Sequence, residues 1–222
     1  MGSVITHLSE RAVRIGAGSA ALEGDLTLPG GASGIVLFAH GSGSSRFSSR
    51  NRRVAQQLQE AGLATLLMDL LTPDEEAVDE RTRHLRFDIG LLAARMIAVT
   101  DWLQQQPDTG ALPLGLFGAS TGAAAALVSA AGRPEATRAV VSRGGRPDLA
   151  ADALEDVRAP TLLIVGGADT EVIALNRQAR DRLSCETDLR IVPGATHLFE
   201  EPGALDAVAG LARDWFTRHF QS

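Results

Sequence analysis

A serine flanked by two glycines is the feature of this sequence with the clearest chemical meaning. Residues 118–122 read Gly-Ala-Ser-Thr-Gly, between an apolar segment at 113–117 and an alanine-rich segment at 123–128. A strand followed by a helix would hold Ser120 on a tight turn, where its hydroxyl is exposed and can act as a nucleophile. The N-terminus of that helix would face any negative charge that develops during acyl transfer. The alternative is a serine that only caps the helix.

A serine hydroxyl needs a base that removes its proton and an acid that orients the base. Two segments supply such groups directly after predicted strands: 166–169 reads Gly-Gly-Ala-Asp, and 193–197 reads Pro-Gly-Ala-Thr-His. In an open α/β sheet, functional loops follow the carboxyl ends of the strands. The chain order Ser120, Asp169, His197 is typical of hydrolases with a Ser-Asp-His triad. We therefore predict Ser120 as the nucleophile, His197 as the base and Asp169 as the orienting acid.

Alternatives remain open for two members of this set. Asp169 could instead cap a helix predicted at 172–183, in which case Glu171 or Asp148 could orient the base. His197 could be a structural loop residue, although it is the only one of the five histidines that follows a late predicted strand. No two histidines show the spacing of metal ligands, so the sequence predicts no catalytic metal.

An acyl-transfer site also needs backbone N–H groups that stabilise the reacting oxygen. Thr121, the residue after the nucleophile, is one predicted donor. The second is expected in the loop after the predicted strand 35–39, which reads His40-Gly41-Ser42-Gly43. We predict the N–H of Ser42 as that donor, with Gly41 beside the substrate. The alternative is a flexible Gly/Ser turn, whereas a dinucleotide-binding loop is excluded because the third glycine is missing.

Arginines in the same predicted loops are candidates for holding an acidic substrate. Arg46 and Arg50 follow the glycine loop, and Arg143 and Arg146 follow a later strand. An arginine can bind a carboxylate through two parallel hydrogen bonds, which makes Arg46 and Arg143 candidate substrate contacts. The alternative is that these arginines pair with carboxylates of neighbouring loops.

The pattern of the chain predicts how these residues are brought together. Apolar strand candidates alternate with helical patterns, which indicates a mostly parallel sheet with helices on both faces. The predicted strands, of which the first two form a hairpin, are 11–15, 20–28, 35–39, 64–68, 113–117, 139–141, 161–165 and 189–192. The predicted helices are 54–61, 85–103, 123–128, 172–183 and 205–216, and the acidic segment 74–80 is predicted as a solvated loop. No linker or repeat interrupts this pattern, so we expect one domain over residues 1–222.

Composition excludes several other classes of function. The net charge of −6 argues against nucleic acid or an anionic membrane as the main partner. No apolar run approaches the length of a membrane span. All 21 basic residues are arginine, so neither a Schiff-base lysine nor a P-loop lysine is present, and the chain has no tyrosine. The single cysteine, Cys185, cannot form an internal disulfide, which suits a reducing cytoplasm.

Together, segments 38–43, 118–122, 166–169 and 194–197 resemble the α/β-hydrolase superfamily, and within it the dienelactone hydrolase-like family of small esterases. The resemblance covers nearly the whole chain. It implies an α/β-hydrolase fold, a three-layer α/β/α sandwich around a mostly parallel sheet of about eight strands. The family's dienelactone hydrolases proper have a cysteine in place of Ser120 and a glutamate in the loop that here reads His40-Gly41. A general carboxylesterase is therefore expected, rather than an enzyme for dienelactone itself.

These observations lead us to expect a cytoplasmic serine esterase that works through an acyl-enzyme without a cofactor. Only residues 142–159 separate two strands between which many relatives insert a lid, so we expect an open cleft for small or short-acyl esters. The expected partner is a small-molecule ester, and both a monomer and a homodimer remain open. One alternative is a binding protein or receptor of the same fold with little turnover. Another is lactone, thioester or amide cleavage, or acyl transfer, by the same three residues.

Overall fold

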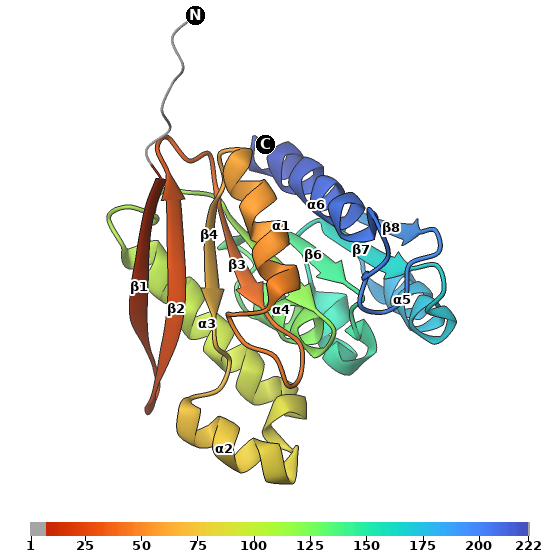
Figure 1. Ribbon diagram of the computed structural model, residues 1–222, viewed down its shortest axis with the longest axis horizontal. Helices are drawn as coiled ribbons and strands as arrows, with labels where there is room; N and C mark the ends of the chain where they lie inside the picture. Colours follow the sequence, from red (N-terminus) through yellow and green to blue (C-terminus); the bar gives the residue numbers. More distant parts are fainter. Residues whose placement is uncertain (1–7, 222) are drawn as a thin grey trace, which may run out of the picture.

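One eight-stranded sheet organises the computed structural model, which describes residues 8–221 (Figure 1). The order across the sheet is β1-β2-β4-β3-β5-β6-β7-β8. The first two strands form an antiparallel hairpin, β2 pairs antiparallel with β4, and all other neighbours are parallel. The strands are β1 (Leu8–Ala17), β2 (Ala20–Pro29), β3 (Ile35–Ala39), β4 (Ala64–Met68), β5 (Leu114–Ala119), β6 (Thr137–Arg143), β7 (Thr161–Gly166) and β8 (Thr187–Val192). The predicted α/β-hydrolase fold is therefore confirmed.

Helices cover both faces of the sheet and complete the three layers. Helices α1 and α6 lie on one face, and α3, α4 and α5 lie on the other (Figure 1). Each face has its own apolar core between sheet and helices. The helices are α1 (Ser49–Glu60), α2 (Pro73–Thr82), α3 (Ile89–Gln105), α4 (Thr121–Gly132), α5 (Thr170–Arg182) and α6 (Ala204–Phe220), with short 3-10 helices η1 (Leu85–Phe87) and η2 (Pro147–Asp156).

Burial of the strands follows from this layering. The central strands β3, β4, β5 and β7 are buried along their whole length, which explains their continuous apolar sequences. Strand β8 is only partly buried, because it forms one edge of the sheet. None of the helices in the described part of the chain is both long enough and apolar enough to cross a lipid bilayer.

The acidic segment predicted as a solvated loop is instead helix α2. The Thr72 hydroxyl accepts a hydrogen bond from the N–H of Glu75, and the Glu75 carboxylate accepts one from the N–H of Thr72. This capping box, with Pro73 at the first helical position, starts a helix without an apolar stripe. The Arg95 guanidinium, whose nitrogens lie 2.5 and 2.6 Å from the Glu75 oxygens, lowers the pKa of that carboxyl to about 2.

Only η2 fills the connection between β6 and β7, so no separate lid domain stands over the sheet within residues 8–221. Helix α2 lies beyond the carboxyl end of β4 (Figure 1), at the edge where the functional loops emerge. The structure thus leaves one edge of the sheet bordered by short loops and by α2.

Close backbone packing at the start of α4 depends on two glycines. A Cβ atom on Gly122 would lie 2.5 Å from the carbonyl oxygen of Ala39 and would also overlap that of His40. A Cβ atom on Gly118 would lie 2.6 Å from the backbone nitrogen of Ala123. Only glycine permits these approaches, so both glycines of the motif are needed to seat α4 against the end of β3.

Replacement of Gly122 by alanine should therefore destabilise the fold. The new methyl group forces apart two buried backbone segments, which we expect to cost about 1–3 kcal/mol. The control is Gly210→Ala in α6, where a Cβ atom meets no described atom within 4 Å. That change should stabilise the helix by about 0.5–1 kcal/mol. Urea unfolding of both variants measures the difference, and a Gly122→Ala variant as stable as the parent would contradict the packing argument.

Candidate active site

Ser120 lies between β5 and α4 in a backbone conformation that side-chain-bearing residues rarely adopt, with φ 51° and ψ −120°. Hydrogen bonds hold it there: its N–H donates to the carbonyl of Arg143 at 3.3 Å, and its carbonyl accepts from Ala123 and Arg146, each at 3.1 Å. Its side chain makes no capping hydrogen bond to the helix and lines a cavity of about 210 Å³. Such strain, held by its surroundings, is typical of a nucleophile on a strand-to-helix turn.

The structure brings His197 and Asp169 together. The distance between His197 Nδ1 and Asp169 Oδ2 is 2.7 Å. The His197 side chain is 38% exposed, and that of Asp169 is 15% exposed. Because the carboxylate can only accept a hydrogen bond, it places the imidazole proton on Nδ1 and leaves Nε2 able to accept a proton.

Backbone contacts between two loops set this pair. The N–H of Gly167 donates to Val192 O at 2.8 Å, and the N–H of Ala168 donates to Ala195 O at 2.9 Å. A Cβ atom on Gly166 would lie 2.5 Å from Thr196 O, so the loops after β7 and β8 pass in direct contact. The paired glycine sequence thus allows the loop carrying Asp169 to reach the loop carrying the imidazole.

The other candidates for the orienting acid are engaged elsewhere. Asp148 pairs with Arg146 through two hydrogen bonds of 2.7 and 2.9 Å. Glu171 lies in the first turn of α5, and its carboxylate makes no hydrogen bond to His197 among the described residues. Asp169 precedes α5, as the capping alternative requires, but its side chain makes no capping bond. Its carboxylate is therefore directed at the imidazole.

Ser120 and His197 line the same cavity, and within residues 8–221 no hydrogen bond joins their side chains. Catalytic contacts of this kind are often long in the absence of substrate and shorten in the complex. The half-buried His197 lines the cavity, whereas Asp169 is not among the residues that line it. The structure thus brings the three residues to the same edge of the sheet, with Ser120 and His197 at one cavity and Asp169 bonded to His197.

The backbone N–H groups of Ser42 and Thr121 lie near Ser120. A Cβ atom on Gly41 would lie 3.1 Å from Ser120 Cβ, so the loop after β3 passes directly against the serine. Ser42 lines the cavity of Ser120, and it shares a second, small cavity of about 10 Å³ with Thr121. In the described chain, neither the Ser42 nor the Thr121 N–H donates to another protein group. The geometry therefore suits the two predicted donors.

Arg143 is a buried cation in the same cavity. Its side chain is only 6% exposed, and Nη2 donates to the Asn51 side-chain oxygen at 3.0 Å. Its Nε is buried and has no hydrogen-bond partner within the described residues. Burial, together with the neighbouring Arg50 guanidinium, lowers the pKa of Arg143 to about 10, so the group stays charged at neutral pH. The residues that line the cavity include no aspartate or glutamate to neutralise it.

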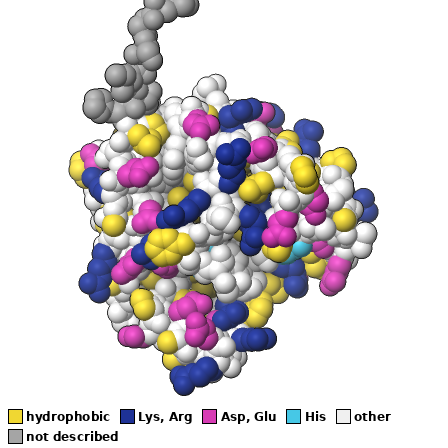
Figure 2. Space-filling view, in the orientation of Figure 1, with side chains coloured by type: hydrophobic (Ala, Val, Ile, Leu, Met, Phe, Trp, Pro, Cys, Tyr) yellow, Lys and Arg dark blue, Asp and Glu magenta, His cyan; other side chains and the backbone are white. Residues whose placement is uncertain are grey.

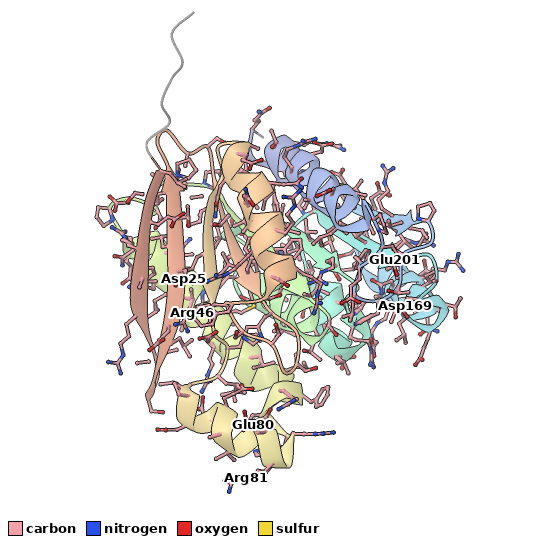
Figure 3. The ribbon with its side chains drawn as sticks, in the orientation of Figure 1. Asp25, Arg46, Glu80, Arg81, Asp169 and Glu201 are labelled. Atoms are coloured by element: carbon pink, nitrogen blue, oxygen red, sulfur yellow. The ribbon has the colours of Figure 1, made fainter. Side chains whose placement is uncertain are left out.

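The other loop arginines are paired with carboxylates. Arg46, predicted as a substrate contact, lies outside the cavity because it pairs with Asp69 and, at 2.8 Å, with Glu23. Figure 3 shows Arg46 beside Asp25 on the β2 side, away from Asp169. Arg146 pairs with an aspartate of its own loop, as described above. Acidic and basic side chains are correspondingly interspersed over the face seen in Figure 2.

The sequence analysis did not predict the contribution of two residues, Asn51 and His40, to this site. Asn51 holds Arg143 from the first turn of α1, but in the run Arg50-Asn51-Arg52-Arg53 it resembles a surface helix residue. His40 is buried at the end of β3 and borders the glycine loop, and its position before that loop was the only available signal. Within residues 8–221, no group of three His, Cys, Asp or Glu side chains is arranged to hold a metal ion.

Comparison with known proteins identifies the family. The model of the dienelactone hydrolase family matches residues 22–221. The crystal structure of a dienelactone hydrolase from Anabaena variabilis is 63% identical, covers 96% of this chain and 98% of its own, and has a TM-score of 0.94. The chain belongs to the dienelactone hydrolase family. An α/β serine hydrolase without a lid from Xanthomonas campestris, 20% identical over 94% of each chain, shares the fold with a TM-score of 0.74.

One relative carries a different name. A Mycobacterium tuberculosis H37Rv protein whose name proposes a phosphoribosyl transferase is 59% identical over 212 residues. The match covers 96% of this chain but 47% of the mycobacterial protein, so the chain spans about half the length of that relative. The name describes a protein about twice as long, whereas the family model matches residues 22–221 of this chain.

Removal of the Asp169 charge should slow the reaction of Ser120 without unfolding the protein. In Asp169→Asn the imidazole loses the partner that sets its tautomer, so labelling of Ser120 by a fluorophosphonate should slow by roughly 10³–10⁴-fold. Glu171→Gln, two residues away, should label at the parent rate. Labelling is followed by intact-protein mass spectrometry. Equal rates for Asp169→Asn and the parent would show that another group orients His197.

Proposed function

We propose that this family member is a serine hydrolase of carboxylic esters. The observation that supports the proposal best is the strained Ser120, which shares a cavity with an imidazole held by a carboxylate at 2.7 Å. These are the groups that ester hydrolysis requires: a nucleophile, its base and an orienting acid. The family match supports hydrolysis, and the ester bond is our inference from the site.

The proposed reaction uses groups of the chain itself. His197 Nε2 takes the proton of Ser120 Oγ while the oxygen attacks the ester carbonyl carbon. The N–H groups of Thr121 and Ser42 donate to the resulting oxyanion. The imidazolium then gives its proton to the departing alcohol, which leaves an acyl-enzyme. Water, deprotonated by the same imidazole, attacks the acyl carbon. The imidazolium then returns the proton to Ser120 Oγ as the bond to the acyl carbon breaks, which releases the acid and the free enzyme.

The shape and charge of the cavity suggest the substrate. Its volume of about 210 Å³ is below the usual range of about 300–1,000 Å³ for drug-sized ligands, which favours a small or short acyl group. Arg143 lines the cavity as a cation, and no aspartate or glutamate is among the other lining residues, which favours a substrate that carries a negative charge. We therefore propose short acidic esters as the substrate class. A cytoplasmic location, suggested by the single Cys185, completes the proposal.

Hydrolysis of p-nitrophenyl esters tests the reaction. We expect turnover that falls as the acyl chain lengthens beyond the capacity of the cavity. Ser120→Ala should lower kcat by about 10⁶-fold, because the serine, its base and the acid act as a unit. A parent enzyme that binds esters without releasing p-nitrophenol would instead indicate a binding protein of this fold.

Arg143 is tested by substrates that differ in charge. In Arg143→Met we expect KM for p-nitrophenyl hemisuccinate to rise by about 10–100-fold, because a charged hydrogen-bonded pair contributes about 1.5–3 kcal/mol. KM for the neutral p-nitrophenyl butyrate should change little. Arg50→Met is the control, since Arg50 lines the same cavity but lies 3.3 Å from Glu200. Equal changes for both esters would assign Arg143 a purely structural role.

A further inference from the structure

The buried imidazole of His40 takes no part in the proposed reaction, yet it borders the site. His40 follows the last residue of β3 and is 7% exposed. Its two ring nitrogens have different partners. Nδ1 lies 2.9 Å from the carbonyl oxygen of Gly41, and Nε2 lies 3.0 Å from the backbone nitrogen of Leu70.

These two partners allow a single protonation state. A carbonyl oxygen can only accept, so Nδ1 carries the proton and donates to Gly41. The Leu70 N–H can only donate, so Nε2 carries no proton and accepts. Burial favours the same neutral ring, because it lowers the pKa of His40 against the opposing effects of the Gly41 carbonyl and of Asp69. The Asp69 carboxylate is itself paired with Arg46.

The bond from His40 orients the peptide that carries the proposed oxyanion donor. The Gly41 carbonyl and the Ser42 N–H belong to one planar trans peptide, so they point in opposite directions. The carbonyl is held by the imidazole and also by the N–H of Ser44, at 3.2 Å. Because the Gly41 oxygen is held toward His40 and Ser44, the Ser42 N–H points away from these two residues. The loop meets Ser120 closely, since a Cβ on Gly41 would lie 3.1 Å from Ser120 Cβ.

The Nε2 side of the imidazole is bonded to a buried backbone segment. Leu70, which donates to Nε2, is buried, and its carbonyl accepts from Arg95 Nη1 at 2.6 Å. Arg95 is also buried and pairs with Glu75 of α2. A chain of hydrogen bonds therefore runs from α2 through Arg95, Leu70 and His40 to the Gly41 carbonyl.

We propose that His40 is a positioning residue whose neutral imidazole holds the Gly41–Ser42 peptide so that the Ser42 N–H is aimed at the reacting oxygen. The inference rests on the proposed function, since it concerns an oxyanion formed at Ser120. It assigns the Nδ1 proton, rather than the bulk of the ring, as the part of His40 that matters for the rate. A preorganised donor acts on the transition state, so its loss lowers kcat more than it changes KM.

Two substitutions separate the two ends of the ring. The amide nitrogen of asparagine occupies nearly the position of Nδ1, whereas the amide group of glutamine reaches the position of Nε2. His40→Asn retains a donor to Gly41, and its kcat on a short p-nitrophenyl ester should remain within about 10-fold of the parent. His40→Gln retains a contact with Leu70 but loses the donor to Gly41, so its kcat should fall by about 10²–10³-fold with KM little changed.

The control is His219→Gln in α6, which removes another histidine that is 7% exposed and lies outside the cavity. It should leave kcat unchanged. Thermal unfolding of each variant separates a loss of fold from a loss of rate. A kcat for His40→Gln within threefold of the parent, or losses of kcat in both His40 variants that follow their losses in stability, would overturn the proposal.

Labelling of Ser120 by a fluorophosphonate keeps this result distinct from the fate of the proposed function. The phosphoryl oxygen of the probe occupies the same donor site, so the labelling rates of the His40 variants should fall in the same order as kcat. A parent enzyme that is labelled but does not cleave esters would reject the ester proposal while the labelling rates still decide the role of His40. A parent that is neither labelled nor active would reject both.

Discussion

The close approach of α4 to the end of β3 is the constraint on which the site depends. Gly122 packs against the carbonyls of Ala39 and His40 at a distance that no side chain would permit. This contact places the first N–H of α4 beside the loop that follows β3, so the two donors come from segments far apart in the sequence. The same contact fixes the position of Ser120, which joins β5 to that helix.

Strain at Ser120 is tolerated because its neighbours leave it no alternative. Its N–H and its carbonyl are both used by backbone groups of the β6 loop and of α4. A positive φ in a residue with a side chain costs on the order of 1–3 kcal/mol, and the packed helix and sheet supply that energy. Backbone hydrogen bonds join the loops after β7 and β8 and bring the His197 imidazole to the Asp169 carboxylate, while Ala195 and Phe199 anchor the second loop in the apolar core.

Sequence patterns predicted the parts of this arrangement that follow from chain order. Strand ends in a parallel sheet share an edge, so Ser120, Asp169 and His197 could be placed together without coordinates. Helix α2 was missed because its acidic composition outweighed the capping sequence Thr72-Pro73-Asp74-Glu75, although that signal was present.

The pairing of the loop arginines could not be predicted, because their partners are distant in the sequence and meet them only in the folded chain. Arg46 follows β3 and Arg143 ends β6, at the edge of the sheet that carries Ser120. Arg46 forms ion pairs with Glu23 and Asp69, whereas Arg143 donates a hydrogen bond to the neutral Asn51. The tautomer of His40 is equally tertiary, since one of its two partners, Leu70, lies thirty residues away.

The burial of Arg143 is a cost that the folded chain bears without an internal counter-ion. Removing a guanidinium from water costs several kcal/mol unless an anion compensates it, and the contacts of Arg143 are the Asn51 amide oxygen and the face of the Phe199 ring, 5.9 Å from the guanidinium carbon. A purely structural role would be served better by an apolar residue of similar volume. The cost is recovered when a negatively charged group enters the cavity, because the attraction is strongest where water is excluded. This cost in stability is therefore an argument for the anionic substrate that we propose.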